Sequence, residues 1–170
     1  VHGIAIAFEL LEGESMLEFL RRTGPMTPET LAPYIRQILR GLADAHSAGV
    51  IHRDLKPSNI FLERRNDGST RVKILDFGIS KLPRSMVKVT LTEPNQSLGS
   101  FMFMPPEQIQ GAKDVDERAD IYAVGTLIFQ SLTGQLPFAT TAVTELVRVK
   151  TRGSARSLRD ASGRVFPELL

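Results

Sequence analysis

Apolar positions recur at helical spacing over two stretches in the first third of the chain. Residues 14–22 carry one short apolar face that ends before Gly24-Pro25, which predicts a helix. Thr27-Pro28 then places a capping residue before a proline at the first helical position, and an apolar stripe continues down to Gly49. This second helix should be the longest in the chain. Pro33 is expected to kink it or to delay its regular start, because its ring removes a hydrogen bond.

Short apolar runs between polar turns predict strands. They are residues 4–8, 50–51, 60–62 and 71–75, with residues 10–13 as the connector after the first and a turn at 66–69 before the last. The polar segment between the second and third runs should therefore lie on a loop held between two strands.

The second half of the chain alternates irregular and helical patterns. Residues 79–108 contain four prolines, which exclude long helices, and a long irregular stretch in a compact domain usually has a function. Residues 120–132 predict an apolar helix that ends at Gly134, and residues 144–151 a short amphipathic one. Residues 153–170 are polar and basic and give no assignment.

Composition narrows the class of protein. With 170 residues, 42% of them hydrophobic, the chain can bury one core, so a single domain is expected. Lys and Arg (21) nearly balance Asp and Glu (19), so charge gives no support to nucleic-acid binding. The chain has no cysteine, which excludes disulfides and cysteine metal sites. The apolar run 121–129 is too short to span a bilayer, so no membrane segment is expected in this chain.

The most specific motif is the octet His52-Arg53-Asp54-Leu55-Lys56-Pro57-Ser58-Asn59. Asp76-Phe77-Gly78 follows it, and Pro105-Pro106-Glu107 lies further on. The first two motifs supply a proton acceptor, a cation and two oxygen groups that suit a hard metal ion, which is the set that phosphoryl transfer from a nucleotide requires. Asp-Phe-Gly alone would be weak evidence, whereas the ordered combination is very specific.

These motifs resemble the catalytic loop and the metal-binding loop of protein kinases, and nearly the whole chain resembles the large lobe of a bacterial-like serine/threonine kinase. The resemblance implies an α+β, kinase-like fold, mainly helical, with short strands around the catalytic loop. Residues 1–170 would be a partial kinase domain with its hinge at 8–13, its catalytic loop at 52–59 and its activation segment at 76–107. The implied reaction transfers the γ-phosphoryl group of ATP to Ser/Thr hydroxyls of a protein partner.

The resemblance assigns four chemical roles. Asp54 is the base that accepts the hydroxyl proton, and Lys56 stabilises charge on the transferred phosphate. Lys56 also favours serine/threonine over tyrosine specificity. Asn59 and Asp76 would hold Mg²⁺ between the phosphates of ATP. Taken singly, each of these residues would more often be a turn former, a cap or a solvated side chain.

Regulatory and scaffold roles also follow from the resemblance. Arg53 would pair with a phosphate on the activation segment, for which Thr90 and Thr92 are the first acceptor candidates and Ser97 a weaker one. Ser100 replaces the threonine that contacts the catalytic loop and guides substrate choice. Asp120 and His52 would be buried scaffold residues, with Asp120 holding the backbone of the catalytic loop. His46 receives no role.

An adenine pocket is expected at the hinge. Phe8 would stand at its back, Glu9 and Leu11 would offer backbone groups to the purine, Phe61 would lie under the ring and Ser15 would contact the ribose. The alternative is that Phe8, Leu11 and Phe61 are ordinary core residues.

Several kinase motifs are not found in the sequence before the hinge: the glycine-rich loop, the lysine strand and the helix with its partner glutamate. Three readings stay open: a fragment of an active kinase, a non-catalytic kinase-like scaffold, and a truncated gene product. The isolated chain is expected to be inactive or weakly active. The resemblance implies a cytoplasmic location, with a membrane tether in a longer parent protein as the alternative.

Overall fold

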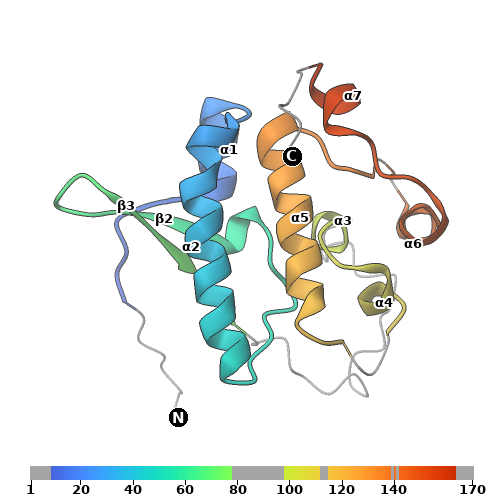
Figure 1. Cartoon of the computed structure of the whole chain (residues 1–170), viewed down its shortest axis with the longest axis horizontal. Coiled ribbons are helices and arrows are strands. Elements are labelled where there is room, and N and C mark those ends of the chain that lie inside the picture. Colours follow the sequence, from blue (N-terminus) through green and yellow to red (C-terminus); the bar gives the residue numbers. More distant parts are fainter. Residues whose placement is uncertain (1–8, 78–97, 112–114, 139, 141, 164–170) are drawn as a thin grey trace, which may run out of the picture.

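Two long helices form the centre of the molecule (Figure 1). The computed structural model describes residues 9–77, 98–111, 115–138, 140 and 142–163. Helix α2 (Pro28–Ser47) packs against helix α5 (Arg118–Thr133), with a three-stranded sheet beside α2 and the smaller helices of the second half of the chain beside α5. The mixture of helices with a small sheet agrees with the predicted α+β class.

The first elements are a strand and a helix rather than one helix from residue 14. Strand β1 (Gly13–Ser15) pairs with β2, and helix α1 (Met16–Thr23) begins only after Ser15. The Ser15 hydroxyl accepts the Glu18 N–H at 3.2 Å, and the Glu18 carboxylate accepts the Ser15 N–H at 2.8 Å. This reciprocal cap fixes the helix start, so the prediction of a helix over 14–22 was wrong for its first two residues.

Helix α2 confirms the predicted cap and length. Thr27 accepts the N–H of Thr30 at 3.4 Å, and the helix starts at Pro28 and runs through Pro33 without interruption. At its end, the Val50 N–H donates to the Ala45 carbonyl at 2.9 Å. Residues 50–51 do not form the predicted strand, because the backbone here closes the helix instead of pairing with another strand.

The sheet has the order β1-β2-β3 and is antiparallel throughout. Strands β2 (Ile60–Arg64) and β3 (Thr70–Ile74) confirm the two runs predicted around the 66–69 turn, with small shifts in their ends. On the outer edge of β3, the Gln37 side chain of α2 accepts the Val72 N–H at 2.9 Å and donates to the Thr70 carbonyl at 3.4 Å. The sheet is thereby fastened to α2.

The remaining elements are helical. They are the 3₁₀ turn η1 (Pro57–Asn59), α3 (Leu98–Phe101), α4 (Pro106–Ile109), α6 (Val143–Arg152) and α7 (Leu158–Ser162). Helix α5 ends at Gly134 in a left-handed conformation, as predicted, and α6 confirms the expected amphipathic helix. Helix α7 was not predicted, although Ser157 caps it and Gly163 ends it. The predicted strand at 4–8 and residues 79–97 of the predicted irregular stretch lie outside the described residues.

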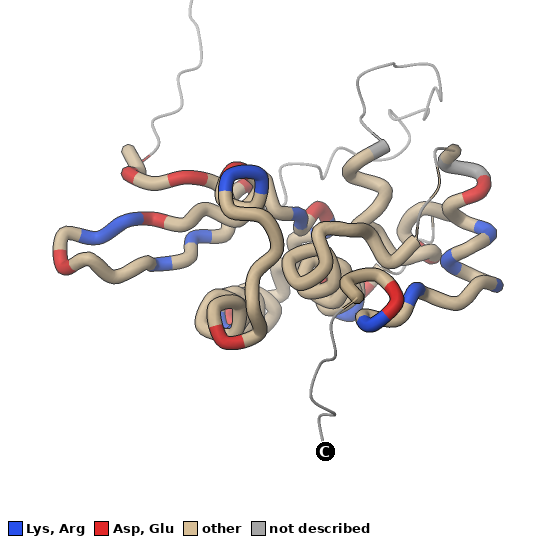
Figure 2. The backbone as a smooth tube through the Cα atoms, turned by 90° about the horizontal axis from the view of Figure 1, so that it is seen from above, with Lys and Arg blue, Asp and Glu red and all other residues tan. Residues whose placement is uncertain are grey.

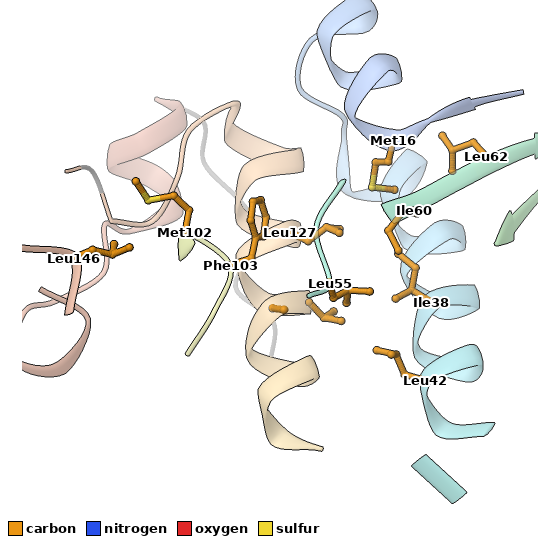
Figure 3. Close-up of a cluster of buried hydrophobic side chains, with 12 residues drawn as sticks. Met16, Ile38, Leu42, Leu55, Ile60, Leu62, Met102, Phe103, Leu127 and Leu146 are labelled. Carbon is orange, nitrogen blue, oxygen red and sulfur yellow. The ribbon is translucent and has the colours of Figure 1, made fainter. Parts of the chain in front are cut away.

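The core lies between α2 and α5. Leu55 and Ile60 project into it from the octet and from β2, beside Ile38 of α2, and Leu127 faces them from α5 (Figure 3). Charged residues lie mainly on the hairpin, on the helix ends and along α6 (Figure 2). Within the described residues, no helix combines the length and the apolarity needed to cross a bilayer.

Gly13 is expected to be indispensable for the pairing of β1 with β2. Its φ is 149°, and a Cβ atom at this position would lie 2.1 Å from the Leu62 carbonyl oxygen. We expect Gly13→Ala to lower the free energy of unfolding by about 2 kcal/mol, measured by urea denaturation. Gly125→Ala in α5 is the matched control. Apart from the backbone of α5 itself, its Cβ would meet no atom of the described residues within 4 Å, so a neutral or slightly stabilising effect is expected.

Candidate active site

The octet forms a loop that is anchored by buried side chains. Leu55 is 1% exposed and Pro57 is buried. Asp54, which precedes Leu55, and Lys56, which follows it, remain partly exposed. Residues 57–59 form the 3₁₀ turn that leads into β2. The buried Leu55 and Pro57 therefore hold the loop while the side chains of Asp54 and Lys56 stay accessible to solvent.

Asp120 at the start of α5 holds the loop backbone. It is 0% exposed, and its two carboxylate oxygens accept the His52 N–H at 2.9 Å and the Arg53 N–H at 2.8 Å. Arg53 has a positive φ of 65°, a backbone conformation that residues other than glycine rarely adopt. Charge-assisted hydrogen bonds offset this strain, which confirms the scaffold role predicted for Asp120.

His46 is a third partner of Asp120 that the sequence reasoning missed. Its Nε2 lies 2.8 Å from the Asp120 Oδ2, 74 residues away in the chain. A signal was present, because Ile38, Leu42 and His46 are spaced by four residues and therefore share one face of α2. Ile38 and Leu42 are fully buried, so a histidine one turn further on that face needs a polar partner.

His52 confirms the prediction of a buried scaffold residue. It is 0% exposed, its Nδ1 accepts the Asp54 N–H at 3.2 Å, and its Nε2 donates to the Leu75 carbonyl at 2.8 Å. Its ring also packs edge-on against Phe77, with centroids 4.9 Å apart. His52 thus joins the octet to the Asp-Phe-Gly motif, of which Gly78 lies outside the described residues.

Asp54 and Lys56 form one hydrogen-bonded group with Ser100. The Lys56 Nζ donates to the Asp54 Oδ2 at 2.8 Å and to the Ser100 hydroxyl at 2.9 Å. The side chains of Asp54 and Lys56 are 31% and 24% exposed. Among the residues that the structure describes, the other carboxylate oxygen of Asp54 has no hydrogen-bond donor. A carboxylate oxygen at the surface next to a cation is suited to accept a proton near a phosphate.

Asn59 and Asp76 come together at one end of the β2–β3 hairpin. The Leu75 N–H donates to the Asn59 carbonyl at 2.8 Å, so Asp76 directly follows the residue that faces Asn59. The Asn59 amide donates to the Asp54 carbonyl at 2.9 Å, which also connects it to the octet. Asp76 is exposed, with a φ of 61°.

Oxygen groups of this kind suit Mg²⁺. No group of three or more His, Cys, Asp or Glu side chains able to hold a metal occurs in the described ranges. One amide oxygen and one carboxylate are what a magnesium ion uses when substrate phosphates and water complete its shell.

Four of the five residues predicted to form the adenine pocket lie in the described part of the chain. Ser15 and Phe61 are register partners across β1 and β2, which places them together. Ser15 caps α1, Leu11 is half-buried, and the exposed Glu9 pairs with Lys73 of β3 at 2.5 Å. Phe8 lies outside the described residues.

Helix α4 and Val115 after it also contact the octet. Gln108 in α4, which sequence reasoning missed, donates to the Arg53 carbonyl at 2.6 Å. The Arg53 guanidinium donates to the Val115 carbonyl at 3.2 Å. The proposed phosphate acceptors Thr90, Thr92 and Ser97 lie outside the described residues, so the regulatory role of Arg53 stays a prediction.

Comparison with known proteins identifies the family. A family model described as the protein kinase domain matches residues 2–165. Serine/threonine-protein kinase pkn3 of Myxococcus xanthus is 42% identical over 137 residues, which cover 80% of this chain and 25% of that protein. PknL of Mycobacterium tuberculosis is 40% identical over 133 residues, 78% of this chain and 31% of that protein.

PrkC of Bacillus subtilis, also a serine/threonine-protein kinase, is 35% identical over 133 residues. These residues cover 78% of this chain and 19% of PrkC, so the chain spans less than a third of the length of these relatives. The ordered motifs, the buried Asp120 under the octet and the match over residues 2–165 lead to one conclusion. The chain belongs to the protein kinase domain family.

Proposed function

We propose that this chain forms the acceptor-binding and metal-binding part of an ATP-dependent serine/threonine protein kinase. The observation that carries the proposal is that the side chains of Lys56 and Asn59 both donate to the Asp54 carboxylate. The Asp54 Oδ2 lies 2.8 Å from the Lys56 ammonium and 3.4 Å from the Asn59 amide nitrogen. The reading as a fragment of an active kinase is favoured because this group is intact and oriented.

In this proposal Asp54 orients the acceptor. A Ser or Thr hydroxyl of the partner protein donates to the Oδ1 atom of Asp54, and its proton passes to that carboxylate as the oxygen attacks the γ-phosphorus of ATP. The bond from the γ-phosphorus to the bridging oxygen breaks, and ADP leaves. The nearby Lys56 ammonium stabilises the charge on the transferred group.

Asn59 and Asp76 would hold Mg²⁺, which neutralises phosphate charge when it is bound. Their placement at one end of the hairpin, beside Asp54, supports this assignment. Glu9, Leu11, Ser15 and Phe61, with Phe8 before them, remain the proposed adenine and ribose contacts. Ser100, whose hydroxyl contacts Lys56, remains the proposed substrate-selecting residue.

The proposal is tested with the natural gene product that contains this chain. We expect transfer of labelled phosphate from ATP to Ser/Thr peptides, no transfer to peptides whose only acceptor is Tyr, and loss of transfer when EDTA removes Mg²⁺. Asn59→Ala is expected to raise the Mg²⁺ concentration needed for half-maximal transfer by about tenfold or more. Asn66→Ala, the same change at an exposed position of the hairpin turn, is the control. Transfer that is insensitive to EDTA would disprove the metal role.

A further inference from the structure

Lys150 of α6 gathers three backbone carbonyls around its ammonium group. Its Nζ donates to Phe101 at 3.0 Å, to Met102 at 2.9 Å and to Met104 at 2.5 Å. An ammonium has three N–H donors, so the whole hydrogen-bonding capacity of Lys150 is directed at one short segment, residues 101–104. No motif in the sequence pointed to this residue.

The ammonium is held without a counter-ion. No ion pair joins Lys150 to a carboxylate within the described ranges, and the Tyr122 ring of α5 lies 5.1 Å from its Nζ. Lys150 is half-buried, and this burial lowers its pKa to about 8. A charge withdrawn from water in this way is tolerated only because carbonyl dipoles and a ring face compensate it.

The segment that Lys150 holds has carbonyls in need of partners. Phe101 ends the single-turn helix α3, and the last carbonyls of a helix have no partner within it. A lysine at this end satisfies them and matches the direction of the helix dipole. One turn before Lys150, the fully buried Leu146 lies near Met102 (Figure 3). Helix α6 therefore contacts this segment through the apolar side chain of Leu146 and the charged side chain of Lys150.

The same segment reaches the candidate active site. Ser100 directly precedes Phe101, and its hydroxyl accepts from Lys56, which also donates to Asp54. Phe103 and Met104 line a small recess together with Arg53 and Asp54. A shift of residues 101–104 would therefore move both Ser100 and one wall beside Asp54. Asn59 and Asp76, in contrast, are placed by the β2–β3 hairpin.

We propose, on the basis of the proposed kinase function, that Lys150 is a positioning residue that fixes residues 100–104 beside Asp54 and thereby sets protein-substrate binding. Loss of its ammonium should loosen this segment and weaken the binding of the acceptor protein. The binding of ATP should be left nearly unchanged, because in the described part of the chain Lys150 contacts residues 101–104 and Tyr122 rather than the hairpin that places Asn59 and Asp76.

Chemical modification of a cysteine at position 150 can separate the effect of the Lys150 ammonium from that of its side-chain length. The chain has no cysteine, so Lys150→Cys introduces a single thiol. Alkylation in denaturant with 2-bromoethylamine, followed by refolding, restores an ammonium at the position of Nζ, with sulfur in place of one methylene. Alkylation with 1-iodopropane gives a neutral side chain of the same length. Arg152→Cys, treated with both reagents, is the matched control, since Arg152 is an exposed residue of the same helix.

Hydrogen–deuterium exchange of the amides at 100–104 is the first measurement. We expect exchange about tenfold faster in the propylated than in the aminoethylated Lys150→Cys chain, with no difference at β2 and β3 or in the Arg152→Cys pair. Equal exchange in the two Lys150→Cys products would overturn the proposal. An equal increase throughout the chain would also overturn it, because it would indicate a general loss of stability.

Kinetics of the natural gene product is the second measurement. Lys150→Met is expected to raise the KM for a Ser/Thr peptide by about tenfold and to change the KM for ATP less than about twofold, with Arg152→Met unchanged. A parallel rise of both KM values would contradict the proposal. The exchange experiment does not require activity. If the gene product transfers no phosphate, the proposed function is disproved, but the effect of Lys150 on residues 100–104 can still be measured.

Discussion

Replacing Asp54 with asparagine is expected to lower phosphoryl transfer by the natural gene product by at least about 100-fold. The amide oxygen of asparagine can still accept from Lys56 and Asn59, which donate to Asp54 in the structure. The loop geometry should therefore be retained while the group that accepts the hydroxyl proton is lost. Initial rates with labelled ATP and a Ser/Thr peptide, at saturating ATP, measure the effect.

Asp44→Asn provides the matched control for this experiment. Asp44 is exposed on α2, and the same chemical change there should leave the rate unchanged. Circular dichroism should give the same spectrum and thermal transition for both variants. An Asp54→Asn variant that retains more than about half of the rate would show that Asp54 is not the proton acceptor.

Replacing Asp120 with asparagine is expected to lower the free energy of unfolding by about 3 kcal/mol. One asparagine oxygen can serve only one of the two backbone N–H groups that Asp120 now accepts, those of His52 and Arg53. The new NH₂ group would face the other N–H, donor against donor, in a site that is 0% exposed. Urea denaturation followed by circular dichroism measures the change.

This second prediction also concerns function. Arg53 keeps its positive φ because Asp120 holds its N–H, so the loop should relax when that bond is lost. Faster hydrogen–deuterium exchange at residues 52–54 should therefore accompany the loss of stability. A change of less than about 1 kcal/mol, or one no larger than that of Asp44→Asn, would contradict the role assigned to Asp120.

Much of the fold and of the candidate site could be predicted because short-range patterns determine them. The stripe of α2 and the turn at 66–69 gave the long helix and the hairpin, and the octet gave the residues that gather around the Asp54 carboxylate. The failure at residues 50–51 occurred because the backbone hydrogen bonds there go to the end of α2 and to a distant side chain. Residues 50–51 read as a strand, but the N–H groups on either side of Ile51 go to Ala45 and Asp120.

The missed residues share a similar cause. His46, Gln108 and Lys150 act through partners that are 74, 55 and 46 to 49 positions away in the chain. A single sequence contains no signal for such pairing beyond the face on which a residue lies. Gln108 and Lys150 also donate to backbone carbonyls, which every residue has, so no complementary side chain marks their partners.

The contact between Gln37 and β3 affects how this molecule meets other chains. An outer strand presents unpaired N–H and C=O groups, which invite a strand of another molecule to add to the sheet and start aggregation. Gln37 occupies the Val72 N–H and the Thr70 carbonyl with one side-chain amide. An incoming strand would have to displace that amide before it could pair there, so a single glutamine protects this edge of the sheet.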